Sequence, residues 1–167
     1  MKKVLLLVVV LSSFFSFAQE ELNVGANLGL AVDQGNGGIS NFAFGIDGNY
    51  LFDISDDFVV GPSIAITNFV GKDDFDSALY LPIAGAIRFH SPDDVFYVGG
   101  DIGYGIALSN VYDSGVYLKP RVGYKISDSF DINAFYAGIR NKDYSFGYVG
   151  LGLNFNVFGS SGGYYYN

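Results

Sequence analysis

The segment from Leu22 to Val32 reads Leu-Asn-Val-Gly-Ala-Asn-Leu-Gly-Leu-Ala-Val, so every even-numbered residue is apolar and every odd-numbered one is Asn, Gly or Ala. Successive side chains of a β-strand point to opposite faces, so this alternation predicts a strand with one apolar face and one small, polar face. The same pattern recurs in seven further segments of the chain. The sequence therefore predicts an all-β protein built from eight strands.

A repeat of 36 residues organises these segments, because Ser55, Ser91 and Ser127 each open a short acidic turn. Each turn leads into a segment that begins with Phe. The chain after the signal peptide therefore divides into four units of about 36 residues, each long enough for two strands and a loop. We expect strands near residues 20–32, 40–52, 58–70, 78–90, 95–108, 116–127, 130–140 and 146–158.

The first residues read as a cleavable secretory signal, with Lys2 and Lys3 before an apolar run and with Ser16 and Ala18 as the small residues of a cleavage site. The apolar run is too short for a membrane-crossing helix. We therefore divide the chain into a signal peptide at 1–19, a barrel domain at 20–158 and a flexible C-terminal tail at 159–167.

Composition narrows the function classes. The chain has no Cys, which excludes disulfides and thiolate metal sites. Its net charge is −8 with only nine Lys and Arg, which argues against a nucleic-acid partner.

The distribution of side chains over the two faces indicates which face is outside. The interior of an eight-stranded barrel is just wide enough for side chains to fill, and five large apolar residues per strand would overfill it. The other face carries mostly Gly, Ala and Asn, whereas a face in contact with water would be dense in charge. We therefore predict an eight-stranded antiparallel up-and-down transmembrane β-barrel, closed so that every backbone polar group is paired. A soluble exported barrel that binds an apolar ligand is the alternative.

Large aromatic side chains cluster beside the Ser-Asp turns, which we expect to face the periplasm together with both chain ends. An aromatic girdle is expected where a barrel meets the lipid interface. Its predicted members are Tyr50, Phe52, Phe58, Phe89, Phe96, Tyr124, Phe130 and Phe155.

These features together resemble the small outer-membrane β-barrel proteins of the OmpA/OmpX type. The resemblance rests on the signal ending at Ser16–Gln19, the eight alternating segments, the short turns and the final segment Leu151–Phe158. It implies a monomer in the bacterial outer membrane that contacts lipid and lipopolysaccharide. In that family a terminal aromatic residue helps the outer-membrane assembly machinery recognise the last strand, and Phe158 matches it in kind.

Charged residues on the predicted inward face form the candidate site. They line either a polar conduit for ions or a core of paired charges that fills the lumen, and the narrow interior favours the second interpretation. The residues are Asp47, Arg88, Asp101, Lys119, Arg121, Lys125 and Asp131.

Other reactive residues do not form a recognisable site. His90 and Ser91 are neighbours on a strand end, so their side chains diverge, and we expect no catalysis. Asp73, Asp74 and Asp76 could hold calcium, but solvated loop charge is the simpler interpretation, and we expect no metal or cofactor. We expect an integral outer-membrane barrel with a structural, adhesion or membrane-integrity role, and a narrow porin-like channel as the alternative.

Overall fold

A computed structural model describes residues 20–34, 40–72, 76–109, 112–142 and 145–158. The predicted signal peptide at 1–19 and tail at 159–167 lie outside these residues. No helix in the described ranges is long and apolar enough to cross a membrane. The strands are β1 (Glu20–Gln34), β2 (Ser40–Ser55), β3 (Phe58–Gly71), β4 (Ala78–His90), β5 (Phe96–Ala107), β6 (Gly115–Ser127), β7 (Phe130–Arg140) and β8 (Ser145–Phe158).

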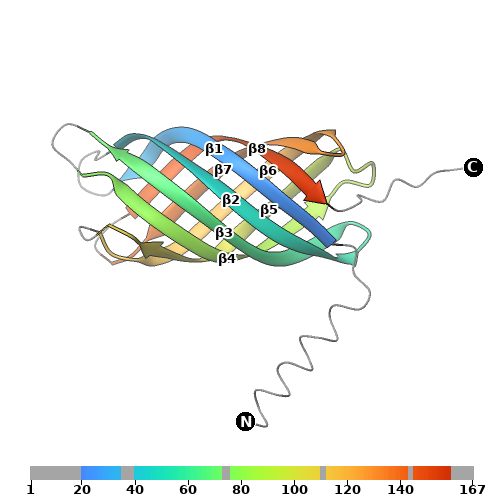
Figure 1. Ribbon diagram of the computed structural model, residues 1–167, viewed down its shortest axis with the longest axis horizontal. Helices are drawn as coiled ribbons and strands as arrows, with labels where there is room; N and C mark the ends of the chain where they lie inside the picture. The colour runs from blue at the N-terminus through green and yellow to red at the C-terminus, as the bar shows by residue number, and fades with distance from the viewer. Residues whose placement is uncertain (1–19, 35–39, 73–75, 110–111, 143–144, 159–167) are drawn as a thin grey trace, which may run out of the picture.

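Each strand pairs antiparallel with the next, and β8 pairs with β1 to close the barrel (Figure 1). The predicted eight-stranded antiparallel up-and-down barrel is confirmed. The largest difference in bounds is at the end of β2, which continues to Ser55 because Phe52 and Asp53 still pair with β3.

The two ends of the barrel differ. Three short turns open at or just after Ser55, Ser91 and Ser127, at the end where β1 begins and β8 finishes (Figure 1). We call this the turn end, and the opposite end, with the other four connections, the loop end. The turn after β4 is the longest of the three, and Asp94 in it adopts the left-handed conformation (φ 53°), which Asp tolerates better than most residues.

The alternation read from the sequence places the side chains as predicted. Large apolar residues of even number on β1 and β5 point outward, and Leu28 and Ile102 are 61% and 62% exposed. Inward residues on the same strands are buried, among them Asn27 and Asp101. The outward face is therefore an apolar surface that continues around the barrel.

Inward glycines allow close approach of backbones and rings. Gly29 and Gly150 face each other where β1 meets β8, and a Cβ on Gly29 would lie 2.2 Å from the carbonyl oxygen of Val149. A Cβ on Gly123 would lie 2.1 Å from Cζ of Tyr97. These positions explain part of the glycine content of the chain, because a larger residue would displace the backbone or the ring.

Candidate functional site in the barrel interior

A group of charged side chains crosses the middle of the lumen. Nζ of Lys119 lies 3.2 Å from Oδ2 of Asp47, and Nη2 of Arg121 lies 3.0 Å from the same oxygen. Both cations are on β6 and the carboxylate is on β2, which are four strands apart in a ring of eight. These ion pairs therefore span the full width of the barrel.

A second carboxylate joins two arginines beside this bridge. Nη2 of Arg121 lies 2.6 Å from Oδ2 of Asp101, and Nη2 of Arg88 lies 2.7 Å from Oδ1. Arg88 also donates through Nη1 to the carbonyl oxygens of Ile87 (2.8 Å) and Gly100 (3.1 Å). The guanidinium of Arg121 thus connects the two carboxylates.

Neutral polar groups add hydrogen bonds to the two carboxylates, whereas Oδ1 of Asp101 is ion-paired with Arg88 and has no hydrogen-bond partner among the described residues. Asn27 donates to Oδ1 of Asp47 at 2.8 Å and accepts from Lys119 at 3.0 Å. Ser63 donates to Asp101 at 3.4 Å. Each carboxylate therefore has both ionic and hydrogen-bond partners.

All of these groups are almost completely buried, with Lys119 and Asp101 each 1% exposed. Buried charges are tolerated when they are paired and hydrogen-bonded, and removing one partner of such a pair is costly. The ammonium of Lys119 also lies 4.6 Å from the centre of the Phe135 ring, within the range of a cation–π contact. We call this group the charged cluster: Asn27, Asp47, Arg88, Asp101, Lys119 and Arg121.

The structure brings five of the seven predicted charged residues into this cluster and places Lys125 and Asp131 nearer the turn end. Asp131 accepts hydrogen bonds from Tyr97 (2.7 Å) and Asn154 (2.9 Å), not from a cation. Lys125 is two inward positions closer to the turn end than Arg121, and it donates to both oxygens of Asp94 at 2.7 Å. It therefore ties β6 to the turn after β4.

Asp94, in the turn after β4, contacts both β4 and β6 at this end of the barrel. Besides its contact with Lys125 on β6, its carboxylate lies 2.9 Å from Nδ1 of His90 on β4. Burial acts to raise the pKa of Asp94, but the contacts with His90 and Lys125 prevail and hold this pKa below its ordinary value. Ser91 instead donates to Asp93 and accepts from the backbone of Phe96. His90 and Ser91 therefore engage different carboxylates and do not meet each other.

The loop-end half of the interior is filled by aromatic rings, which are not among the predicted site residues. The Phe146 ring on β8 lies 5.3 Å from that of Phe69 on β3 and 5.7 Å from that of Tyr80 on β4. Since β4 and β8 are opposite strands, these rings also cross the lumen. Their signal was available in the sequence, because they occupy inward positions near the loop ends of their strands. We call this group the aromatic cluster: Phe69, Tyr80, Tyr112, Tyr117, Phe135, Phe146 and Tyr148.

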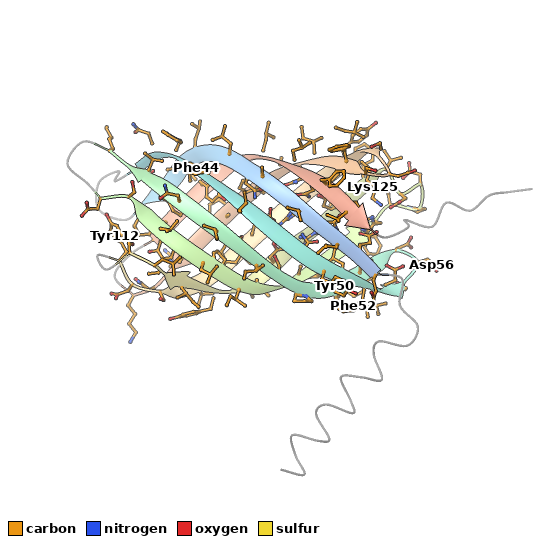
Figure 2. All side chains as sticks on the ribbon, viewed as in Figure 1. Phe44, Tyr50, Phe52, Asp56, Tyr112 and Lys125 are labelled. Atoms are coloured by element: carbon orange, nitrogen blue, oxygen red, sulfur yellow. The ribbon has the colours of Figure 1, made fainter. Side chains whose placement is uncertain are left out.

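Tyr112 belongs to the connection between β5 and β6 and lies at the loop end of the barrel (Figure 2). Its ring lies 5.0 Å from that of Phe146, and its hydroxyl donates to the carbonyl oxygen of Asp76 at 3.2 Å. Tyr80 donates to the carbonyl oxygen of Asp113 at 3.3 Å. The connection is therefore bound to the barrel mouth by rings and by hydrogen bonds.

The residues of the predicted girdle lie on the outward face near the turn end, and Figure 2 marks Tyr50 and Phe52 there. They meet in pairs across neighbouring strands or along one strand. The ring centres are 5.0 Å apart in three pairs: Tyr50–Phe52, Phe96–Tyr124 and Phe130–Phe155. Phe58 and Phe89 are register partners on β3 and β4.

The acidic loop with Asp73, Asp74 and Asp76, for which we expect solvated charge and no metal, is only partly described, because Asp73 and Asp74 lie outside the described residues. Within the described ranges, no three His, Asp or Glu side chains are arranged to hold a metal ion.

Comparison with known proteins identifies the fold. No family model matches the sequence, and no curated protein matches it. Among solved structures, Ail, the attachment invasion locus protein of Yersinia pestis, is similar with a TM-score of 0.61 and 14% identity, covering 83% of this chain and 98% of Ail. The N-terminal barrel domain of Pseudomonas aeruginosa OprF has a TM-score of 0.53 at 14% identity, covering 84% and 99%. Neisserial surface protein A has a TM-score of 0.51 at 14% identity, covering 81% and 95%. The chain therefore shares the eight-stranded barrel fold of these proteins.

Proposed function

We propose that this protein is exported and spans the bacterial outer membrane as a monomeric barrel with a closed interior, in a structural, adhesive or membrane-integrity role and without catalysis. The observation that carries the proposal is an exposed apolar face around the barrel, with the lumen bridged by side chains inside it. In this proposal the outward face contacts lipid and lipopolysaccharide, and the assembly machinery inserts the barrel.

The outward face supports the membrane part of the proposal. Leu28, Ile102 and Leu151, on three different strands, are 60–62% exposed. Monomeric soluble proteins rarely expose contiguous apolar patches beyond a few hundred Å². The shortest strand has 11 residues, and a transmembrane strand needs about 9–11. Closure leaves no unpaired strand edge, as a bilayer requires.

The two lumen-crossing clusters support a closed interior. Asp47 meets Lys119 and Arg121 across the barrel, and Tyr80 meets Phe146 across it nearer the loop end. An ion passing through would have to separate the buried ion pairs and displace the rings. The charged lining still favours a narrow channel as the second candidate, since it offers polar groups along part of the path.

Cell fractionation tests the location. We expect the protein in the outer-membrane fraction, with faster gel mobility when the sample is not boiled, because a closed barrel stays folded in detergent. The variant Ile102→Arg places a charge on the outward face and should reduce the folded band, at a cost of about 2–4 kcal/mol if the site lies at mid-membrane. Asn41→Arg, at an exposed position near the loop end, is the matched control and should leave the band unchanged.

Recovery of the protein in the soluble periplasm without a mobility shift would contradict the membrane proposal and favour the soluble alternative. Planar-bilayer recordings test the closed interior. We expect no steady conductance from the folded protein. Reproducible single-channel steps would contradict the closed interior and support the narrow channel.

A further inference from the structure

The turn end of the barrel contains an acidic hollow that the proposed function does not use. It has a volume of about 280 Å³ and opens beside Asp56 and Lys125, both marked at this end in Figure 2. Five carboxylates line it, those of Glu21, Asp53, Asp56, Asp57 and Asp94. Among the described residues of its wall, Lys125 supplies the only ammonium, and this group is already paired with Asp94.

Glu21 is the feature that needs an explanation. Its side chain points inward from β1 and is only 8% exposed, yet it makes no hydrogen bond or ion pair with any described residue. Asp53, a second inward carboxylate, lines the same hollow. The Glu21 oxygens are not among the fully buried unpaired atoms, so they reach the open space of the hollow. A carboxylate held away from bulk water without a partner costs free energy, and the other carboxylates around the same hollow add to that cost. A bound cation would remove both costs.

The wall of the hollow presents acceptors. Because the Asp94 carboxylate can only accept, Nδ1 of His90 carries the hydrogen of the contact between them. Nε2 has no hydrogen-bond partner among the described residues. Glu21, His90 and Lys125 also line a smaller cavity of about 30 Å³ that lies deeper toward Arg88. The hollow therefore fits a ligand whose polar groups are donors.

The size of the hollow and the wide spacing of its acidic groups favour an organic cation over a metal ion. The hollow is much larger than a single ion, and within the described residues no three acidic or His side chains converge as metal ligands do. An ammonium group donates three hydrogen bonds and carries one positive charge, and an alkyl chain would fill the remaining space.

We propose that this hollow binds an alkylammonium group, with Glu21 and Asp53 holding the charge. The ligand is a small diamine or polyamine, or a lysine side chain that offers the same group. The site needs only the closed barrel, so it stands independently of the membrane location.

Titration of the folded, processed protein in zwitterionic detergent tests the site, with spermidine as the probe and heat or NMR shifts as the readout. The processed chain carries an N-terminal amine close to Glu21. Because this amine is present in the titration, its competition with spermidine for the hollow is included in the measured affinity. We expect saturable binding of one spermidine per barrel. Glu21→Gln should weaken it about tenfold or more, the size of one lost charge-assisted hydrogen bond.

Asp113→Asn is the matched control, because it removes the same charge from an exposed position at the loop end. It should leave spermidine affinity unchanged. Equal weakening by both variants, or no saturable binding, would overturn the site. Binding of Mg²⁺ at the same residues with equal or higher affinity would also overturn it, since a metal site would replace the organic-cation site.

Two further measurements sharpen the proposal. N-acetyl-trilysine amide carries the same charge as spermidine, so a large preference between them identifies whether a peptide or a free polyamine is the better source of the ammonium. Urea unfolding without ligand should show Glu21→Gln to be as stable as the parent protein or more stable. A clear loss of stability would mean that Glu21 already has a partner in the protein and would overturn the proposal.

Discussion

The charged cluster and the aromatic cluster close the same lumen by different physical means. In the charged cluster, each contact depends on a partner at a particular place, such as Asp101 between Arg88 and Arg121. In the aromatic cluster, Phe146 touches Phe69, Tyr80 and Tyr112 through ring contacts that depend mainly on shape and volume. Loss of a partner should therefore damage the first cluster, whereas loss of volume should damage the second.

The largest effect is expected from Asp101→Asn, which leaves Arg88 without a carboxylate in the buried interior. We expect a loss of about 4 kcal/mol in the free energy of unfolding, as for other broken buried ion pairs. Urea unfolding in lipid vesicles measures it, followed by circular dichroism because the chain has no Trp.

The double variant Asp101→Asn/Arg88→Met tests whether the cost arises from an unpaired charge. It should recover a large part of the lost stability, since an apolar group replaces the orphaned guanidinium. If the double variant is no better than Asp101→Asn alone, the cluster is not stabilised through pairing.

The aromatic cluster should respond to a loss of volume. Phe146→Ala is expected to lower the free energy of unfolding by about 3 kcal/mol, because it opens a cavity against three other rings. Phe146→Leu keeps much of the volume and should lose less than half as much in the same urea experiment. Equal losses from both variants would show that ring packing does not decide the stability of this half.

The smallest effect is expected at the turn end, where the ion pair of Asp94 and Lys125 is partly exposed to solvent. Because the pKa of Asp94 is lowered in the folded protein, its contribution is complete above the ordinary carboxyl pKa and is lost as the pH falls through the lowered pKa. Solvent screening limits this contribution to about 1 kcal/mol or less.

To check this contribution, the free energy of unfolding is measured from pH 7 down to pH 2 for the parent protein and for Asp94→Asn, and the two values are compared at each pH. The parent should be the more stable at pH 7, and the gap should narrow in acid. A gap that widens as the pH falls would show that the sign of the linkage is wrong.

Much of the fold was predictable because it depends on local pattern. Alternation with a period of two assigns each side chain to a face, and the serines of the 36-residue repeat mark the turns at Ser55, Ser91 and Ser127. The aromatic cluster was missed for a different reason. Tyr80 and Phe146 occupy inward positions, but alternation assigns only a face and does not show which of the inward residues meet across the lumen.

The contacts of the charged inward residues also differ in how far they could be predicted from the sequence. Asp101 pairs with Arg88 and with Arg121 across the neighbouring strands β4 and β6, and hairpins adjacent in sequence bring these residues near each other. Lys125 and Asp131 are register partners across β6 and β7, yet the side chains bind Asp94 and Tyr97 instead. The alternation along each strand places these side chains inside the barrel, but it does not predict which of the other inward side chains each one binds.

The eight strands, the face that each residue takes and the position of each turn could be predicted from the amino-acid sequence, because these follow from the geometry of a single strand or hairpin. The contacts of Asp47 with Lys119 and Arg121 across the lumen and of Tyr80 with Phe146 could be seen only in the closed barrel. The same holds for the burial of Glu21 without a cation among the described residues. Those contacts depend on the stagger with which eight strands close into a ring, which sets the height of each residue relative to the opposite wall. No single strand contains that information, since it is fixed only when β8 pairs with β1.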